Sequence, residues 1–100
     1  MKPYRVLCVK AKREKHPPTG IVPPVGLLYL ASVLRQHRKF EVYILDCWVE
    51  KDPIDSFRRA LQEINPHVVG ISATTLEFSF ATKLANLARM ICPKVKVVIG

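Results

Sequence analysis

The residues best suited to chemistry in this 100-residue chain are small hydroxyl side chains in the segment Ser72-Ala73-Thr74-Thr75, directly after an apolar run. Small side chains at the end of a strand let a planar ring system approach the backbone, and the amides that open a helix donate hydrogen bonds. Thr74 also suits a helix cap, because Glu77 follows three residues later as in a capping box. The segment therefore predicts a helix cap, with ligand contacts by Ser72, Thr74 and Thr75 as a further role.

Gly26 is a second candidate contact, because it stands in the first turn of an apolar helical pattern that follows Pro23-Pro24. Glycine costs a helix interior roughly 0.5–1 kcal/mol relative to alanine, so a cofactor or the neighbouring strand is expected to pack closely against its backbone. The glycine spacing is not GxGxxG, which disfavours a conventional dinucleotide site. Without that glycine loop, Asp46 is interpreted as an ordinary loop carboxylate.

The other reactive side chains form no catalytic set. A ligand role for His16 is the less favoured interpretation, because a lone histidine is more often a solvent-facing loop residue. The widely spaced cysteines encode neither a disulfide framework nor a CxxC metal site and favour a reducing, cytoplasmic setting; they are Cys8, Cys47 and Cys92. We therefore expect a binding segment with no catalytic residue and no metal ligand of its own, and the sequence leaves open whether it belongs to an enzyme.

The net charge of +8 raises the question of an anionic partner. The cations that precede residue 16 are Lys2, Arg5, Lys10, Lys12, Arg13 and Lys15. They fit either a nucleic acid or phosphate-bearing ligand, or a solvated surface. The solvated surface is favoured, because no aromatic residues interleave with the cations as stacking platforms. No apolar run approaches the ~20 residues that a membrane span needs, so no membrane span is expected.

Alternating strand and helix patterns predict the architecture. Nearly continuous apolar runs indicate strands covered on both faces at residues 4–9, 41–45, 67–72 and 95–99. Apolar stripes at helical spacing follow Pro24 (Leu27, Leu30, Ala31, Leu34), Asp52-Pro53 (Ile54, Phe57, Leu61, Ile64) and Thr74 (Ala81, Leu84, Ala88, Ile91). The order βαβαβαβ predicts a three-layer α/β fold with an open parallel sheet, flavodoxin-like or Rossmann-like, of strand order 2-1-3-4.

In such a sheet the ligand lies beyond the carboxyl ends of the strands, at the switch point between the first and third strands. Gly26 and the segment 72–75 then form two walls of one cleft. The fourth strand runs to Ile99-Gly100 and is expected to leave an apolar edge unpaired. Residues 1–100 are therefore expected to be one domain that is truncated before its last helix and strand.

Four segments, 23–31, 41–46, 66–75 and 97–100, resemble in their order and spacing the amino-terminal cobalamin-binding domain of B12-dependent radical SAM enzymes. The resemblance implies that cobalamin is the cofactor. It also implies that Ser72, Thr74 and Thr75 line the pocket for the nucleotide tail of cobalamin, and that Gly100 opens a glycine pair packed against that tail. The downstream radical SAM domain is then the natural partner.

The same resemblance implies a His-off binding mode. Related B12 domains carry an Asp-x-His-x-x-Gly motif, but here Glu14-x-His16 is followed by three residues before Gly20. The CxxxCxxC motif is absent as well, so S-adenosyl-L-methionine (SAM), the 4Fe-4S cluster and the methyltransferase or cyclase chemistry are expected downstream. The alternative is a basic α/β nucleic-acid-binding module, which rests on the net charge and the cationic first loop.

Overall fold

The computed structural model describes residues 3–14 and 25–100. The predicted alternation of strands and helices is confirmed. In chain order the elements are β1 (Tyr4–Lys10), α1 (Val25–Arg35), β2 (Phe40–Asp46), α2 (Pro53–Ile64), β3 (Val68–Ser72), the short 3-10 helix η1 (Thr75–Glu77), α3 (Phe78–Ile91) and β4 (Lys96–Ile99).

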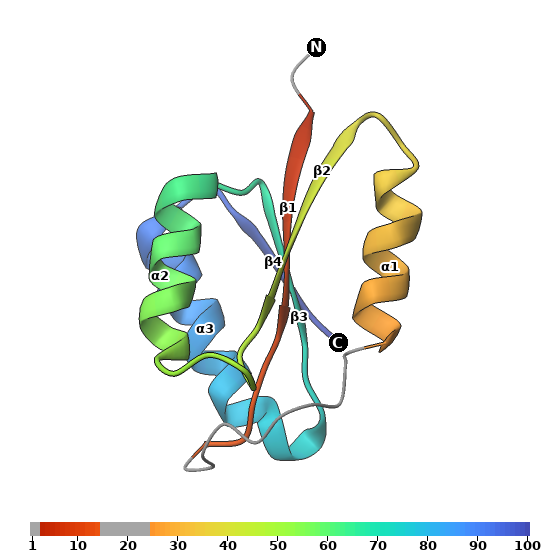
Figure 1. Cartoon of the computed structure of the whole chain (residues 1–100). Helices are drawn as coiled ribbons and strands as arrows, with labels where there is room; N and C mark the ends of the chain where they lie inside the picture. Colours follow the sequence, from red (N-terminus) through yellow and green to blue (C-terminus); the bar gives the residue numbers. More distant parts are fainter. Residues whose placement is uncertain (1–2, 15–24) are drawn as a thin grey trace.

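The four strands form one parallel sheet in the order β2-β1-β3-β4, as the sequence predicts. Helix α1 covers one face of the sheet, and α2 and α3 cover the other (Figure 1). Because the strands are parallel, all of them end at one edge, which we call the carboxyl edge and which lies at the bottom of Figure 1. All of them begin at the opposite edge, which we call the amino edge.

The larger part of the core lies between the sheet and the pair α2 and α3. Phe57, Leu61 and Leu84 are completely buried there against Val9 and Val69 of the sheet. The predicted stripes of both helices are confirmed, with Ile54, Ile64 and Ile91 partly buried at their margins. This side of the sheet is therefore a complete layer.

Helix α2 has the predicted ends. The carboxylate of Asp52 accepts a hydrogen bond from the Asp55 amide at 3.1 Å, and Pro53 occupies the first turn, where its missing N–H costs nothing. The helix ends at Asn65, whose φ of 49° places it in the left-handed region. Its backbone N–H donates to the Leu61 carbonyl at 2.9 Å.

Helix α1 packs alone on its face of the sheet, and two expectations are wrong there. Leu27 and Ala31 are buried, but Leu30 is 50% exposed, because only a narrow line of an isolated helix reaches the sheet. The strands are also not all covered on both faces. Val98 of β4 is 59% exposed, because α1 lies over β1 and β2. Among the helices described, none is long and apolar enough to cross a membrane.

Candidate functional site

The predicted contact segment after β3 and Gly100 lie side by side at the carboxyl edge. The Ala73 amide donates to the Gly100 carbonyl at 3.2 Å, and the Gly100 amide donates to the Ile71 carbonyl at 3.0 Å. On the other side of β3, the Ala11 amide donates to the Ser72 carbonyl at 3.0 Å. The ends of the central strands β1 and β3 and of β4 therefore form one connected backbone surface.

The exposure of the predicted residues suits a bound ligand. Ser72 is half-buried, whereas Thr74, Thr75 and Gly100 are exposed. A Cβ atom added to Gly100 would meet nothing within 4 Å among the described residues. The edge thus offers hydroxyl groups beside open backbone, the combination that close approach of a large cofactor needs.

The explanation of Gly26 by strand packing is wrong for the described residues. Its added Cβ would also meet nothing within 4 Å, and the residue is exposed at the start of α1. Gly70, in the middle of β3, has the same open surroundings. As far as the described residues go, the face of β3 on the side of α1 is therefore open beside Gly70. A contact between Gly26 and a cofactor stays a prediction.

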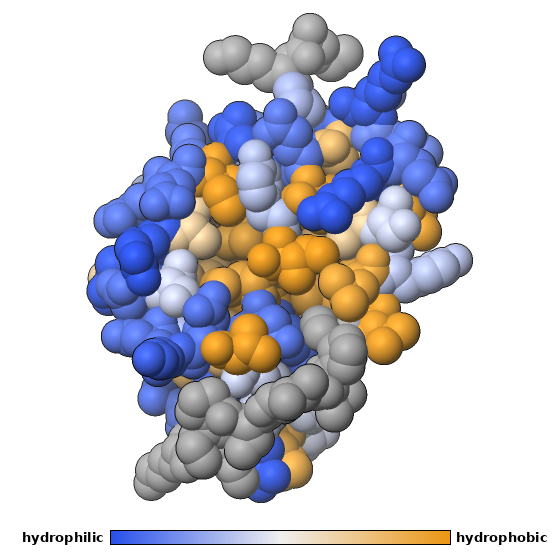
Figure 2. Space-filling model, viewed as in Figure 1, coloured by the Kyte–Doolittle hydropathy of each residue, from blue (hydrophilic) through white to orange (hydrophobic). Residues whose placement is uncertain are grey.

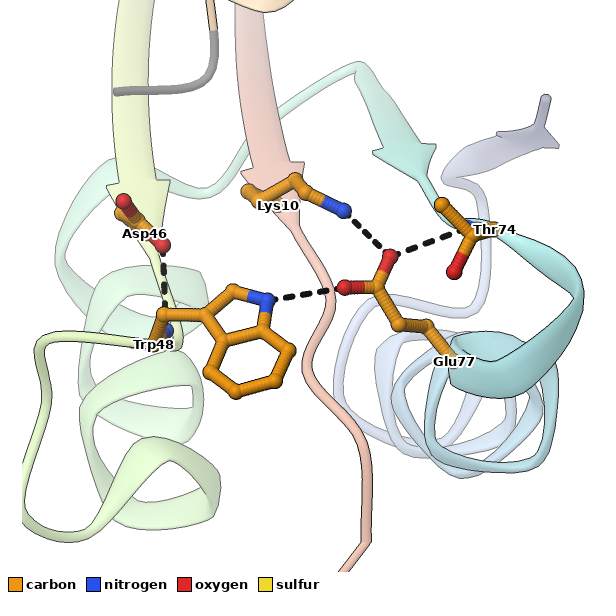
Figure 3. Close-up of polar contacts among 5 residues, drawn as sticks. All are labelled: Lys10, Asp46, Trp48, Thr74 and Glu77. Atoms are coloured by element: carbon orange, nitrogen blue, oxygen red, sulfur yellow. Dashed lines mark hydrogen bonds and ion pairs between the residues drawn. The ribbon is translucent and has the colours of Figure 1, made fainter. Parts of the chain in front are cut away.

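Behind this surface lies a buried carboxylate, Glu77, whose side chain takes three hydrogen bonds (Figure 3). Its exposure is only 4%. It accepts from the Nζ of Lys10, from the indole N–H of Trp48 at 2.8 Å and from the Thr74 amide at 2.9 Å. We call Lys10, Trp48 and Glu77 the edge cluster.

The hydrogen bonds keep Glu77 ionised in spite of its burial. Burial by itself raises the pKa of this carboxyl, because it penalises the charged form. The hydrogen bonds from Lys10, Thr74 and Trp48, together with the positive charge of Lys10, outweigh burial and hold the pKa of Glu77 below its usual range. At neutral pH the edge cluster therefore contains a buried ion pair with one additional indole donor.

The edge cluster connects three strand ends. Lys10 is the last residue of β1, Trp48 follows the end of β2, and Glu77 closes η1 after β3. The last residue of β2, Asp46, accepts a hydrogen bond from the Trp48 amide at 3.0 Å. One carboxylate thus fixes the loops that surround the predicted contact segment.

Sequence reasoning missed the edge cluster. The predicted capping box of Thr74 and Glu77 is confirmed, but the turn that it caps is the 3-10 helix η1, and α3 follows from Phe78. The Thr74 amide is therefore bound by Glu77 and is not free to donate to a ligand. The available signals were the Thr-x-x-Glu spacing and a single tryptophan, and neither reveals that Lys10 lies nearby.

In the described part of the cationic first loop, residues 10–14, two lysines are not solvated as expected. Lys10 pairs with Glu77, and Lys12 is 9% exposed. Glu14 adds a negative charge to the loop and pairs with Lys83 at 2.6 Å. Lys2 and Lys15 lie outside the described residues. Lys10 and Lys12 are therefore not exposed contacts for a nucleic acid.

The histidines and cysteines offer no metal site in the part of the chain that the structure describes. His16 lies outside the described residues, and His37 and His67 lie near the amino edge, before β2 and β3 begin. All three cysteines are buried, and burial raises the pKa of each thiol. For Cys47, burial and the neighbouring carboxylates Asp46 and Glu50 raise it to about 12.

Known proteins similar to this chain indicate its family. The family model described as the B12 binding domain matches residues 16–100. The chain is 36% identical over 78 residues to a curated protein of Pyrococcus horikoshii named "Uncharacterized methyltransferase PH0819". That match covers 78% of the chain and 17% of the relative, so the chain spans only a small part of the relative's length. No solved structure matches the chain. The 2-1-3-4 parallel sheet and the match over residues 16–100 together show that the chain belongs to the B12-binding domain family.

Proposed function

We propose that this domain holds cobalamin at the carboxyl edge for a radical SAM enzyme of the methyltransferase or cyclase class. The observation that carries the proposal is the side-by-side position of the segment 72–75 and Gly100, with open space beyond the glycine backbone. The name of the Pyrococcus horikoshii relative supports a methyltransferase. In this function the domain binds and orients the cofactor, and substrate chemistry takes place elsewhere in a longer protein.

We assign the following roles to the chain's own residues. The hydroxyl groups of Ser72, Thr74 and Thr75 exchange hydrogen bonds with the polar nucleotide tail of cobalamin. Gly100 and Gly26 let the tail approach the backbone, since neither carries a Cβ that would fill the space. When bound, cobalamin supplies a cobalt centre that carries a methyl group or assists radical chemistry, together with SAM and a 4Fe-4S cluster of the longer protein.

The edge cluster has a positioning role in this function. The carboxylate of Glu77 holds Lys10, Trp48 and the Thr74 amide from behind the contact segment. Because these loops are fixed before the cofactor binds, less conformational entropy is lost on binding. The domain should therefore bind cobalamin with little rearrangement of its carboxyl edge.

Retention of cobalamin tests the binding site. The protein is incubated with hydroxocobalamin and passed through gel filtration, and the corrin absorbance should elute with the protein. Gly26→Leu and Gly100→Leu should leave the apoprotein folded, because each new side chain enters open space, but should weaken cobalamin retention. Ser32→Leu, at an exposed position of α1, is the matched control and should retain cobalamin. Loss of the corrin from the unaltered protein would overturn the proposal.

The His-off mode has a separate spectroscopic test. Of the described histidines, His37 and His67 lie near the amino edge, away from the proposed site, which supports a cobalt without a protein imidazole ligand. The variant His16→Ala should therefore bind cobalamin with an unchanged corrin spectrum. Its cobalt(II) form should have the same electron paramagnetic resonance signal as the unaltered protein. A change in nitrogen coupling on removal of His16 would show that this imidazole is a ligand.

The radical SAM assignment is tested on the longer protein. Anaerobic reconstitution with iron and sulfide should produce iron–sulfur absorbance, and reduction should cleave SAM. A longer protein that binds cobalamin but neither assembles a cluster nor cleaves SAM would place the domain in another class of B12 enzyme.

A further inference from the structure

A pocket of about 810 Å³ lies at the amino edge, at the opposite end of the strands from the proposed cobalamin site. It is lined by residues 4–5, 39–40, 65–68 and 91–96, which are the starts of all four strands and the end of α3. Its volume falls within the roughly 300–1,000 Å³ that is typical of small-molecule sites. Nothing in the proposed function uses this pocket.

The charge of the pocket is one-sided. Four cationic side chains line it, those of Arg5, Lys39, Lys94 and Lys96, and no Asp or Glu does. All eight acidic residues of the chain belong to the described ranges, and none forms an ion pair with these four cations. The positive charge of the pocket is therefore left uncompensated by the chain, and an anion would gain from binding there.

Two of the polar residues are already held in place. The Nδ1 of His67 accepts a hydrogen bond from the Arg5 amide at 2.9 Å, so a neutral ring carries its proton on Nε2. The ring of Tyr4 meets that of His67 edge to face, with centroids 5.1 Å apart. The guanidinium Nε of Arg5 donates to the Asn65 carbonyl at 3.1 Å. A ligand would thus meet side chains that have lost part of their freedom before binding.

The rest of the lining is largely apolar. It includes Phe40, Val68, Ile91, Pro93 and Val95. Figure 2 shows hydrophobic residues among hydrophilic ones at the upper end of the molecule, where β1 begins. A site with apolar walls and several cations fits a ligand that has an apolar body and an acidic group.

We propose that the amino-edge pocket binds an amphiphilic organic anion, with its carboxylate, sulfonate or phosphate group at Arg5 and the three lysines. Its aromatic or aliphatic body packs against Phe40 and Val68. This site is independent of the cobalamin site, because the two lie at opposite ends of the strands. Both ligands bind the same domain at once.

The test uses two probes of equal shape, naphthalene-2-sulfonate and its neutral analogue naphthalene-2-sulfonamide. Binding of each probe is monitored by the changes that it causes in the NMR chemical shifts of the backbone amides. The sulfonate should shift amides at residues 65–68 and 91–96, and the sulfonamide should bind more weakly. Lys94→Gln/Lys96→Gln should weaken sulfonate binding roughly threefold or more, because each exposed charge contributes modestly. Arg13→Gln/Lys51→Gln removes the same charge from the loops at the carboxyl edge and should leave binding unchanged.

Several results would overturn the proposal. One is equal affinity for naphthalene-2-sulfonate and naphthalene-2-sulfonamide. Another is an equal loss of sulfonate affinity in the two double variants, because that would show that the probe responds only to the net charge of the domain. Displacement of the sulfonate by hydroxocobalamin would show that both ligands share one site. Chemical-shift changes confined to amides at the carboxyl edge would likewise show that the sulfonate binds at the cobalamin site and not in the amino-edge pocket.

Discussion

Replacing Glu77 by glutamine tests whether one carboxylate joins the three strand ends. The substitution keeps the shape of the side chain and removes its charge. The ammonium group of Lys10, 19% exposed, then loses its ionised partner, and the indole of Trp48 loses a charged acceptor. The change therefore isolates the electrostatic part of the edge cluster.

The structure sets the expected size of the effect. Removing one partner of a buried ion pair costs about 3–5 kcal/mol, because the remaining charge stays in a poorly solvated site. Lys10 keeps some contact with water, so we expect Glu77→Gln to lower the free energy of unfolding by about 2–3 kcal/mol. For a domain of this size, that corresponds to a fall in melting temperature of roughly 10–20 °C.

Urea denaturation followed by tryptophan fluorescence measures this effect directly, because Trp48 is the single tryptophan and contacts Glu77. The pKa of Glu77 is lowered in the folded state. Its stabilising contribution is therefore complete above the unfolded value of about 4.3 and is lost as the pH falls through the folded pKa. The stability difference between the protein and Glu77→Gln should be full at neutral pH and should shrink in acid.

Glu63→Gln, an exposed change of the same kind on α2, is the control and should alter stability by at most about 0.5 kcal/mol. Lys10→Met combined with Glu77→Gln should cost less than the sum of the two single changes, because the pair is already broken by either one. The reasoning fails if Glu77→Gln costs no more than Glu63→Gln, or if its cost does not depend on pH.

Three further predictions concern the core and the loops. Phe57→Ala should lower the free energy of unfolding by about 3–5 kcal/mol in urea titrations, since the ring is fully buried; a cost below that of an exposed change would contradict the packing. At Asn65, with its φ of 49°, alanine should destabilise by about 1 kcal/mol in thermal melts and glycine should not; the reverse order would exclude the left-handed conformation. The thiol of Cys47, whose pKa burial and nearby carboxylates raise to about 12, should react with a disulfide reagent at mildly alkaline pH only after unfolding, and fast reaction in the folded protein would refute its burial.

Much of the fold is predictable from local patterns. Continuous β-branched runs identify the strands, the stripe of Phe57 and Leu61 identifies α2, and Asp52-Pro53 marks where it begins. The regular alternation of strands and helices then restricts the topology, because crossovers between parallel strands are right-handed. For these reasons the order 2-1-3-4 could be predicted before any contact was known.

Single-helix coverage of one face was not predictable in the same way. The periodicity of α1 treats Leu27, Leu30 and Ala31 alike, yet Leu30 is exposed, because no second helix of the described chain packs beside α1. Val98 is exposed for a related reason, since α1 does not extend over β4. Periodicity shows which side chains share a helix face and does not show how wide the covering layer is.

The sequence by itself determined that the contact segment 72–75 lies at the carboxyl edge, because all strands of a parallel sheet end at the same edge. Only the tertiary structure decided the partner of Glu77. Lys10 is 67 residues away along the chain, and the register of β1 against β3 brings the two side chains together. The capping residue Glu77 and Lys10 therefore form a largely buried ion pair, which no local sequence pattern indicates.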